Sequence, residues 1–303
     1  MNDHDTCIIL NMLNGIGGLS AWKRRGPHIR ALVESCGSVS SIFELDPAFI
    51  SRVGGIGIEQ AERIPRWRDF VDLDRELEDA QKAGATILCR TDDDYPESLR
   101  ELANPPLCIY LLGALPPDLA DRSIAIVGTR TPSDHGIGMA GRFSESAASA
   151  GWTTISGLAL GIDTVAHQTT IEAGGRTVAV PGSGLANLYP AENAGLADAI
   201  VRTGGAVVSE YPMHTESTRY TLPRRNRIIA GLARCTLVVE AAAKSGALMT
   251  AGHASERGAR VFAVPGAEDS PMAAGCRELI RQGAEPANGF DDILNAFRRD
   301  RRG

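Results

Sequence analysis

Residues 123–130 read SIAIVGTR, and residues 153–163 read TTISGLALGID. In each stretch a short apolar run ends at a glycine, and a segment with helical spacing of its apolar side chains follows. This order is typical of a buried parallel strand and its crossover helix. Further apolar runs stand at residues 177–180, 206–209, 236–240 and 261–264. The sequence therefore predicts an α/β fold with a doubly wound, mostly parallel, extended Rossmann-like sheet, preceded by a small all-α domain.

The composition is that of a globular chain, because 43% of the 303 residues are hydrophobic and 22% are charged. No apolar run is long enough to cross a bilayer, and the first ten residues lack the pattern of a signal peptide. We therefore expect a soluble, intracellular chain with no membrane partner. The six cysteines and six histidines show no metal-ligand spacing, so we expect reduced thiols, no metal and no other cofactor.

The formal net charge of -6 is distributed unevenly. Residues 69–101 hold eleven acidic and four basic residues, a net charge of -7, whereas residues 211–260 hold eight basic and three acidic residues, a net charge of +5. Only three of the 31 basic residues are lysines, and none follows a glycine, which excludes a P-loop ATPase. The basic stretch is compatible with a nucleic-acid partner despite the acidic total.

The N-terminal part repeats a pattern after forty residues. An apolar pair, then Gly-apolar-Gly, then an alanine occur at residues 10–21 and again at residues 50–61, which predicts a helix, a glycine hairpin and a second helix in each copy. The pattern resembles the helix-hairpin-helix unit, which implies duplex DNA phosphate contacts at the hairpins. The residues concerned are Gly15, Gly17, Gly55 and Gly57. A docking module that binds no DNA is an equal alternative.

Four regions are expected along the chain. Residues 1–66 form a helical, tandem helix-hairpin-helix-like domain, and residues 67–121 form an acidic connecting segment with a strand. Residues 122–297 form the Rossmann-like domain, which begins after the proline pairs at 105–106 and 116–117. Residues 298–303 form a short basic tail, although a frayed terminus is the default interpretation.

Ligands of a doubly wound sheet bind beyond the carboxyl ends of its strands, so the loops there are the candidate site. Gly136, Gly138 and Gly141 fit the GxGxxG dinucleotide fingerprint, but eight residues separate them from the strand end at Val127. This distance places the three glycines inside a helix and argues against NAD.

Two loops place small residues where a helix begins. These are Gly128-Thr129-Arg130 and the loop that opens with Ser156-Gly157. Unpaired N–H groups and the positive end of a helix favour a phosphate there, and the Arg130 guanidinium adds a charged contact. Asp163 is as suited to capping its helix as to contacting a ligand.

The segment LPRRNRIIAGL at residues 222–232 is the densest signal. Pro223 suits a first helical turn, and Ile228, Ile229 and Leu232 are spaced to face a core. The polar residues of the opening turns are Arg224, Arg225, Asn226 and Arg227. Cations at that helix end oppose the dipole, so anion binding explains them better than a solvated face does. Lys244 and Ser245 stand at the entrance of the next helix and complete the predicted site.

No nucleophile and base, and no group of metal ligands, has the spacing of a hydrolase or nuclease. Asp163 and His167 stand four residues apart, which favours a helix-stabilising contact over a metal site. Glu210 and Glu240 at strand ends keep open an alternative function, a Rossmann-like nucleotide-binding hydrolase that acts on a small phosphorylated nucleoside. A protein-interaction scaffold with a vestigial pocket is a third possibility.

Taken together, these motifs resemble the DNA-processing protein A family, DprA or Smf, from about residue 122 to residue 294. The motifs are Ile126 to Arg130, Ser156 to Asp163 with Ala166-His167, Gly184-Leu185 with Tyr189-Pro190, Ser209 to Pro212, Pro223 to Leu232, and Val261 to Gly266. The resemblance implies a cytoplasmic bacterial protein, not an enzyme, that binds single-stranded DNA without sequence preference. It also implies protection of incoming DNA in natural transformation, help in loading the RecA recombinase, and a homodimer.

The resemblance implies DNA contacts from Arg130, the Ser156-Gly157 loop, residues 224–227 and Lys244. Tyr211 and Tyr220 flank the basic segment and are the candidates for base stacking. The chain departs from the family where members commonly have Thr-Ala-Arg and this chain has Thr-Ala-Gly at 250–252, and where members have asparagine and this chain has Arg277. Many members also have a C-terminal winged helix, which we expect to be missing here.

Overall fold

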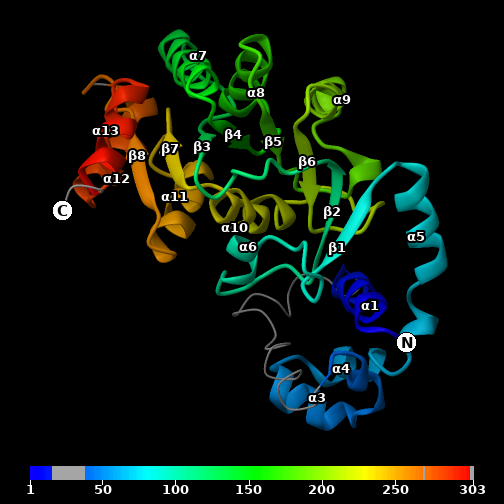
Figure 1. Ribbon diagram of the computed structural model, residues 1–303. Helices are drawn as coiled ribbons and strands as arrows, with labels where there is room; N and C mark the ends of the chain where they lie inside the picture. Colours follow the sequence, from blue (N-terminus) through cyan, green and yellow to red (C-terminus); the bar gives the residue numbers. More distant parts are fainter. Residues whose placement is uncertain (16–37, 269, 301–303) are drawn as a thin grey trace. The chain divides into compact units, whose positions relative to one another are not determined.

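The computed structural model describes residues 1–15, 38–268 and 270–300, with backbone only at residues 14, 15 and 300. The chain forms two compact units, which are drawn in Figure 1. The first takes the described residues up to 111 together with residues 184–187 and 209–215, and the second takes the others. The first unit ends at Leu111, within β2 (Cys108–Gly113), whereas the sequence predicts the start of the Rossmann-like domain at residue 122.

The first unit is mainly helical. Its elements are α1 (Asp3–Gly15), η1 (Ser40–Glu44), α3 (Pro47–Gly54), α4 (Ile58–Arg63), η2 (Trp67–Asp69), α5 (Leu73–Lys82), β1 (Thr86–Cys89), α6 (Glu97–Arg100) and β2. The two strands are antiparallel, with Cys89 opposite Cys108. Their pairing brings thiols from distant parts of the sequence onto neighbouring strands.

The second predicted hairpin is present between α3 and α4. Gly55 ends α3 with φ of 63°, a left-handed conformation that glycine adopts without strain, and Gly57 begins α4. The Ser51 hydroxyl donates to the Ile56 carbonyl at 2.7 Å and closes the turn. The first predicted hairpin contains Gly17, which lies outside the described residues, while Gly15 is the last residue of α1. DNA contacts of the glycines remain predictions.

The second unit is built on a parallel sheet. Its strands are ordered β6 (Ala206–Ser209), β5 (Thr177–Ala179), β4 (Thr153–Ser156), β3 (Ser123–Val127), β7 (Cys235–Val238), β8 (Arg260–Ala263) and β9 (Glu285–Pro286). The chain winds outward from β3 in one direction to β6 and then in the other to β9, so the predicted doubly wound fold is correct. The six predicted strands are present, whereas β9, a two-residue edge strand, has no apolar run that marks it.

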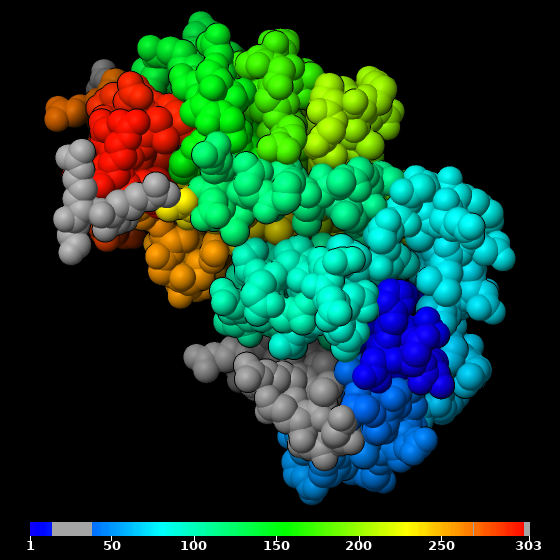
Figure 2. Space-filling view, in the orientation of Figure 1, coloured from blue at the N-terminus to red at the C-terminus, as the bar shows by residue number. Residues whose placement is uncertain are grey.

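Helices cover the sheet of the second unit in two layers (Figure 1). The helices are α7 (Asp134–Ser149), α8 (Ile162–Glu172), α9 (Ala194–Arg202), α10 (Thr221–Leu232), α11 (Ala247–Glu256), α12 (Ala274–Arg281) and α13 (Phe290–Asp300), with short η3 (Leu185–Asn187), η4 (Ala191–Asn193) and η5 (Pro271–Ala273) turns. α7 packs on α8 and α13, and α10 packs on α11. The green α7, α8 and α9 form a continuous surface in the space-filling view (Figure 2). Gly136, Gly138 and Gly141 lie inside α7, as the sequence predicts.

Burial follows the predicted pattern along the helices of this layer. Phe143 of α7 and Ile162 of α8 pack with Trp152 and with Phe290 of α13 over β3 and β7. Trp152 meets Phe290 edge to face, with 5.4 Å between ring centroids. No helix in the described part of the chain is both long and apolar enough to span a membrane.

His167 is fully buried in α8 and bonds to Thr177, so the predicted contact with Asp163 is wrong. The Thr177 hydroxyl donates to the Thr154 carbonyl at 2.8 Å, which makes His167 Nδ1 the donor in the 2.7 Å bond to Thr177 Oγ1. Nε2 has no hydrogen-bond partner among the described residues. Burial, reinforced by the positive charge of Arg225, lowers the pKa of His167 to about 3, so the imidazole is neutral.

Acid should therefore destabilise the second unit through His167. Below pH 6.5 the unfolded chain takes up a proton that the folded chain excludes until about pH 3, so the free energy of unfolding falls as pH falls through that range. The slope is about 1.4 kcal/mol per pH unit. Urea titrations at pH 7 and pH 5 on the native chain and on His167→Asn should show a loss that the variant lacks. Equal losses in both proteins would assign the acid sensitivity to other groups.

Candidate nucleic-acid interface

The loops after β3 and β4 are fastened to each other. The Thr129 N–H donates to the Glu240 carbonyl at 2.8 Å, and the Ile162 N–H donates to the Thr129 carbonyl at 3.1 Å. Gly161 has φ of 83°, and a Cβ there would lie 2.4 Å from the Thr129 carbonyl oxygen. Glycine is therefore required for the close approach of the two loops. Arg130 emerges from this rigid junction with an exposed side chain.

The loop after β4 folds around the Asp163 carboxylate. The N–H groups of Gly157 and Ala159 donate to Asp163 Oδ2 at 3.0 and 3.4 Å. The prediction that the backbone N–H groups of this loop face an external phosphate is therefore wrong for these two residues. The Ser156 hydroxyl also turns inward and donates to the Ile126 carbonyl at 2.6 Å. Of the two roles considered for Asp163, a cap and a ligand contact, the structure shows the cap. The carboxylate accepts from N–H groups of the loop that precedes its helix.

Asp163 is a buried acid in a balanced environment. Burial raises its pKa above the usual value, while the positive charge of Arg225 and the two loop N–H groups act in the opposite direction. The loop conformation therefore depends on the positive charge that α10 supplies. A Cβ at Gly157 would lie 2.6 Å from the carboxylate, so glycine is needed at this position too.

Arg225 lies inside the protein and not in a groove. Its side chain is 4% exposed, its Nη1 donates to the carbonyls of Gly157 and Val180, and its Nε donates to Asn226 Oδ1 at 3.1 Å. These carbonyls stand at the carboxyl ends of β4 and β5, where the strand ladder ends. A guanidinium satisfies several such acceptors at once. The expected phosphate contact of Arg225 is therefore replaced by a structural role.

Two other polar residues of α10 are also buried. Asn226 Nδ2 donates to the Gly246 carbonyl at 3.1 Å, and Arg227 Nη1 donates to the Arg224 carbonyl at 3.2 Å. Asn226 thereby links α10 to the loop after β7, and Arg227 closes the first turn of α10. Neither side chain reaches solvent, so the expected contacts with an anion are not available to them. Arg224 is half-buried. The predicted core residues Ile228, Ile229 and Leu232 are buried.

The loop after β7 presents one cation and hides one carboxylate. Lys244 is exposed, and Ser245 Oγ accepts from the Ala247 N–H at 3.3 Å at the start of α11. Glu240 is buried and accepts from the N–H and the hydroxyl of Ser133 at 2.9 and 2.7 Å. Glu240 thereby fixes the start of α7. Its contacts are with Ser133, so they support neither the expected arginine partner nor the alternative role in a hydrolase.

A small hollow of about 30 Å³ lies at this edge, and exposed side chains form part of its lining. Its lining residues are Arg130, Gly157, Ala159, Leu160, Tyr189, Pro190 and Leu222. The Tyr189 side chain is 47% exposed and Leu160 is also exposed. A guanidinium, an aromatic ring and an aliphatic side chain therefore face solvent together, a combination that suits a phosphate with its attached base.

The aromatic residues differ from the sequence prediction. Tyr211 is 8% exposed and belongs to the first unit. The prediction that its ring stacks on a base is therefore wrong. Tyr220 is 38% exposed, and the Arg219 guanidinium lies 4.8 Å from its ring centroid. Tyr189 was not predicted as a platform. Its sequence signals were its place in a loop after a strand and the Tyr189-Pro190 motif of the family resemblance.

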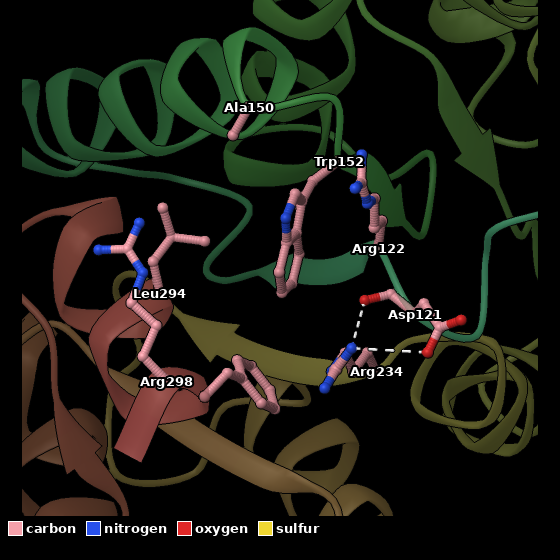
Figure 3. A pocket seen from close by; sticks show the side chains of 8 residues that line it. Asp121, Arg122, Ala150, Trp152, Arg234, Leu294 and Arg298 are labelled. Carbon is pink, nitrogen blue, oxygen red and sulfur yellow. Dashed lines mark hydrogen bonds and ion pairs between the residues drawn. The ribbon is translucent and has the colours of Figure 1, made fainter. Parts of the chain in front are cut away.

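A larger hollow, of about 420 Å³, lies at the opposite edge of the sheet (Figure 3). Arg122, Trp152 and Arg234 line it, and they immediately precede β3, β4 and β7, so this is the amino edge. Arg234 donates to the Asp121 carbonyl at 2.6 Å and lies 3.7 Å from its carboxylate. Trp152 is only 8% exposed and packs against Phe290 with the two rings nearly perpendicular, so little of its ring is accessible to a base. The carboxyl edge is therefore the better candidate.

The chain is similar to known proteins both in sequence and in fold. The chain matches the family model of DNA recombination-mediator protein A over residues 86–298. Protein Smf from Synechocystis is 38% identical over 287 residues, which cover 94% of this chain and 70% of that protein. DNA processing protein DprA from Bacillus subtilis is 37% identical over 225 residues, which cover 74% of this chain and 75% of that protein.

Two solved structures are similar to the chain. DNA processing protein A from Streptococcus pneumoniae matches with a TM-score of 0.78 and 31% identity, over 96% of this chain and 97% of that one. DNA processing protein A from Helicobacter pylori, a protein described for its single-stranded DNA binding mode, matches with a TM-score of 0.62 and 24% identity. That match covers 71% of this chain and 96% of the other, and it shows a shared fold.

Proposed function

Because the chain belongs to the DNA recombination-mediator protein A family, we propose that it binds single-stranded DNA at the carboxyl edge of the parallel sheet and breaks no bond in it. The observation that carries the proposal is the hollow that exposed Arg130 and exposed Tyr189 line together. The description of the Helicobacter pylori relative as a single-stranded DNA binder supports the same ligand.

The proposed binding surface consists of fewer charges than the sequence indicates. Arg130 and Lys244 are exposed, and Arg224 is half-buried. They stand in the loop after β3, at the start of α10 and in the loop after β7. Gly128, Thr129 and Ser245 are half-buried beside these cations. The N–H groups of Thr129 and Ser245 already donate to the carbonyls of Glu240 and Ala242, so these two groups hold the loops and do not contact a phosphate. The other predicted site residues position these loops through buried contacts. They are Arg225, Asn226, Arg227, Ser156 and Gly157.

Removal of either exposed cation should weaken binding to oligonucleotides of unrelated sequence by similar factors. Each phosphate contact of a single strand contributes about 0.7 to the slope of log affinity against log salt. Arg130→Ala and Lys244→Ala should therefore each bind more weakly and lower that slope by roughly one contact. Fluorescence polarisation with two unrelated oligonucleotides at several salt concentrations measures both effects.

Arg122→Ala is the matched control, because Arg122 is also an exposed arginine at the mouth of a hollow, but at the amino edge. Its affinity and salt slope should equal those of the native chain. A larger loss in Arg122→Ala than in Arg130→Ala would move the DNA to the hollow of Figure 3 and refute the proposed surface.

Tyr189 should contribute by stacking on a base. Loss of one base–aromatic contact costs about 1–3 kcal/mol of binding free energy. Tyr189→Ala should therefore weaken binding about 5- to 150-fold, while Tyr189→Phe, which keeps the ring, should bind like the native chain. The same polarisation assay, done with an oligomer that lacks bases at consecutive positions, should show little difference between the variants. A loss in Tyr189→Phe equal to that in Tyr189→Ala would exclude stacking.

We extend the proposal to what the family resemblance implies. The chain protects incoming DNA in natural transformation and helps to load the RecA recombinase, acting in the cytoplasm as a homodimer. A nuclease-protection assay, the lag before RecA filaments form on DNA, and light scattering test these three statements separately. Duplex DNA contacts at Gly55 and Gly57 are a further proposal, tested by mobility shifts with duplex oligonucleotides.

A further inference from the structure

Three metal-ligating side chains meet in the first unit, far from the proposed DNA surface in sequence. They are His4 of α1, Cys89 at the end of β1 and Asp92 in the following turn. A ring nitrogen of His4, the Cys89 Sγ and an Asp92 carboxylate oxygen all lie within 4.8 Å of one another. The residues are 85 and 3 positions apart, a spacing that no sequence pattern for metal sites includes.

The distances suit a tetrahedral ion. His4 Nε2 lies 3.4 Å from Asp92 Oδ2. Two ligands bound to zinc at about 2.1 Å, at a tetrahedral angle, are about 3.4 Å apart. The Cys89 thiol donates to the His4 carbonyl at 3.4 Å, and His4 Nε2 lies 3.3 Å from the Ile87 carbonyl, so an ion would replace both contacts. A zinc–sulfur bond is about 2.3 Å long, so the thiol would also move toward the ion.

The carboxylate is already held in place. The Cys89 N–H donates to Asp92 Oδ2 at 2.7 Å, and the Asp92 N–H donates to the Cys89 carbonyl at 2.8 Å. This tight turn fixes the carboxylate beside the cysteine that would share the ion. A backbone bond to a ligating carboxylate is the kind of outer contact that orients metal ligands.

Access and chemistry also agree. Cys89 is buried, whereas the side chains of His4 and Asp92 are 36% and 27% exposed, so an ion can enter from solvent on their side. A thiolate, an imidazole and a carboxylate form a donor set suited to zinc, whereas calcium and magnesium prefer oxygen ligands alone. With three protein ligands, a water occupies the fourth position. Binding releases the Cys89 thiol proton to solvent.

We propose that His4, Cys89 and Asp92 bind one Zn²⁺ ion and thereby fasten the start of α1 to the end of β1. Cys7 and Cys108 lie next to the site, and both thiols interact with the thiol of Cys89, whose pKa is raised by the Cys108 contact and by burial. The site belongs to the first unit, whereas the proposed DNA surface belongs to the second, and the site carries no catalytic step. Its consequence is a metal-dependent increase in the thermal stability of the first unit.

Cobalt(II) is the probe, because its tetrahedral thiolate complexes absorb in the visible and show a sulfur-to-metal charge-transfer band in the near ultraviolet. The full chain, without a histidine tag, reduced and treated with chelator, should develop these bands with one equivalent of Co²⁺ and lose them when Zn²⁺ is added. His4→Asn, Asp92→Asn and Cys89→Ser should each abolish the charge-transfer band or weaken Co²⁺ binding at least about tenfold.

Cysteine controls separate this site from other thiols. Cys276→Ser, in α12 of the second unit, and Cys36→Ser, outside the described residues, should both keep the bands. His4 is partly exposed, so His4→Asn keeps the test valid if Cys89→Ser does not fold. Absence of the charge-transfer band in the native chain, or an unchanged band in His4→Asn, would overturn the proposal.

Discussion

Replacement of Arg225 by methionine should lower the free energy of unfolding by about 3–5 kcal/mol. The substitution keeps much of the side-chain volume but removes the donors to the carbonyls of Gly157 and Val180. It also removes the positive charge that opposes the burial of the Asp163 carboxylate. Such a loss is a large share of the 5–15 kcal/mol that a folded domain has available. Urea denaturation followed by tryptophan fluorescence measures it.

Arg130→Met is the matched control for this prediction. Arg130 is an exposed arginine of the same unit, and its substitution should change the free energy of unfolding by less than about 0.5 kcal/mol. The two variants should thus separate a structural arginine from a binding one: Arg225→Met loses stability, whereas Arg130→Met loses DNA affinity at full stability. If Arg225→Met unfolds like the native chain, the buried contacts described for α10 are not significant for stability.

Gly161→Ala should have a comparable effect through the backbone. Gly161 has φ of 83° and ψ of -127°, a conformation that costs a side-chain-bearing residue about 1–3 kcal/mol. Its new Cβ would also lie 2.4 Å from the carbonyl oxygen of Thr129 and 2.7 Å from the carbonyl oxygen of Arg130. These are backbone atoms, so the loop that carries Arg130 must move. We expect a loss of stability above about 3 kcal/mol and weaker DNA binding below the unfolding temperature.

Gly174→Ala is the control that separates the steric overlap at residue 161 from the cost of a positive φ. Gly174 also has a positive φ, 72°, but a Cβ there meets nothing within 4 Å. It should therefore cost only the conformational strain, about 1–2 kcal/mol, with unchanged DNA affinity. Equal stability losses in the two variants would show that the β3 and β4 loops are not held together as closely as described.

The strand pattern was readable from the sequence because buried parallel strands are short apolar runs, two of which end here at a glycine. Residues 123–127 and 153–156 are strands β3 and β4, and the three glycines of the false dinucleotide fingerprint lie in α7. Pro223 and the spacing of Ile228, Ile229 and Leu232 also located α10 and its core face. These features depend on local periodicity, which a single sequence contains.

The sequence did not predict which charged side chains point to solvent and which point into the protein. An arginine in the first turn of a helix can reach outward to a phosphate or inward to carbonyls at strand ends, and Arg224 and Arg225 are neighbours with different environments. The choice at Arg225 depends on Gly157 and Val180, which lie 68 and 45 residues away in the chain. The exposed pair of Arg130 and Tyr189 likewise comes from two loops that meet only in the fold.

The sequence by itself determined the alternation of strands and helices, the carboxyl edge as the candidate surface and the second glycine hairpin. The tertiary structure alone decided which cations of that edge face solvent, and it alone brought His4 to Cys89 and Asp92. The physical reason is range. Hydrogen bonding within helices and the burial of alternating runs act between near neighbours in the chain, whereas charge compensation and ligand geometry act between side chains that are adjacent only in space.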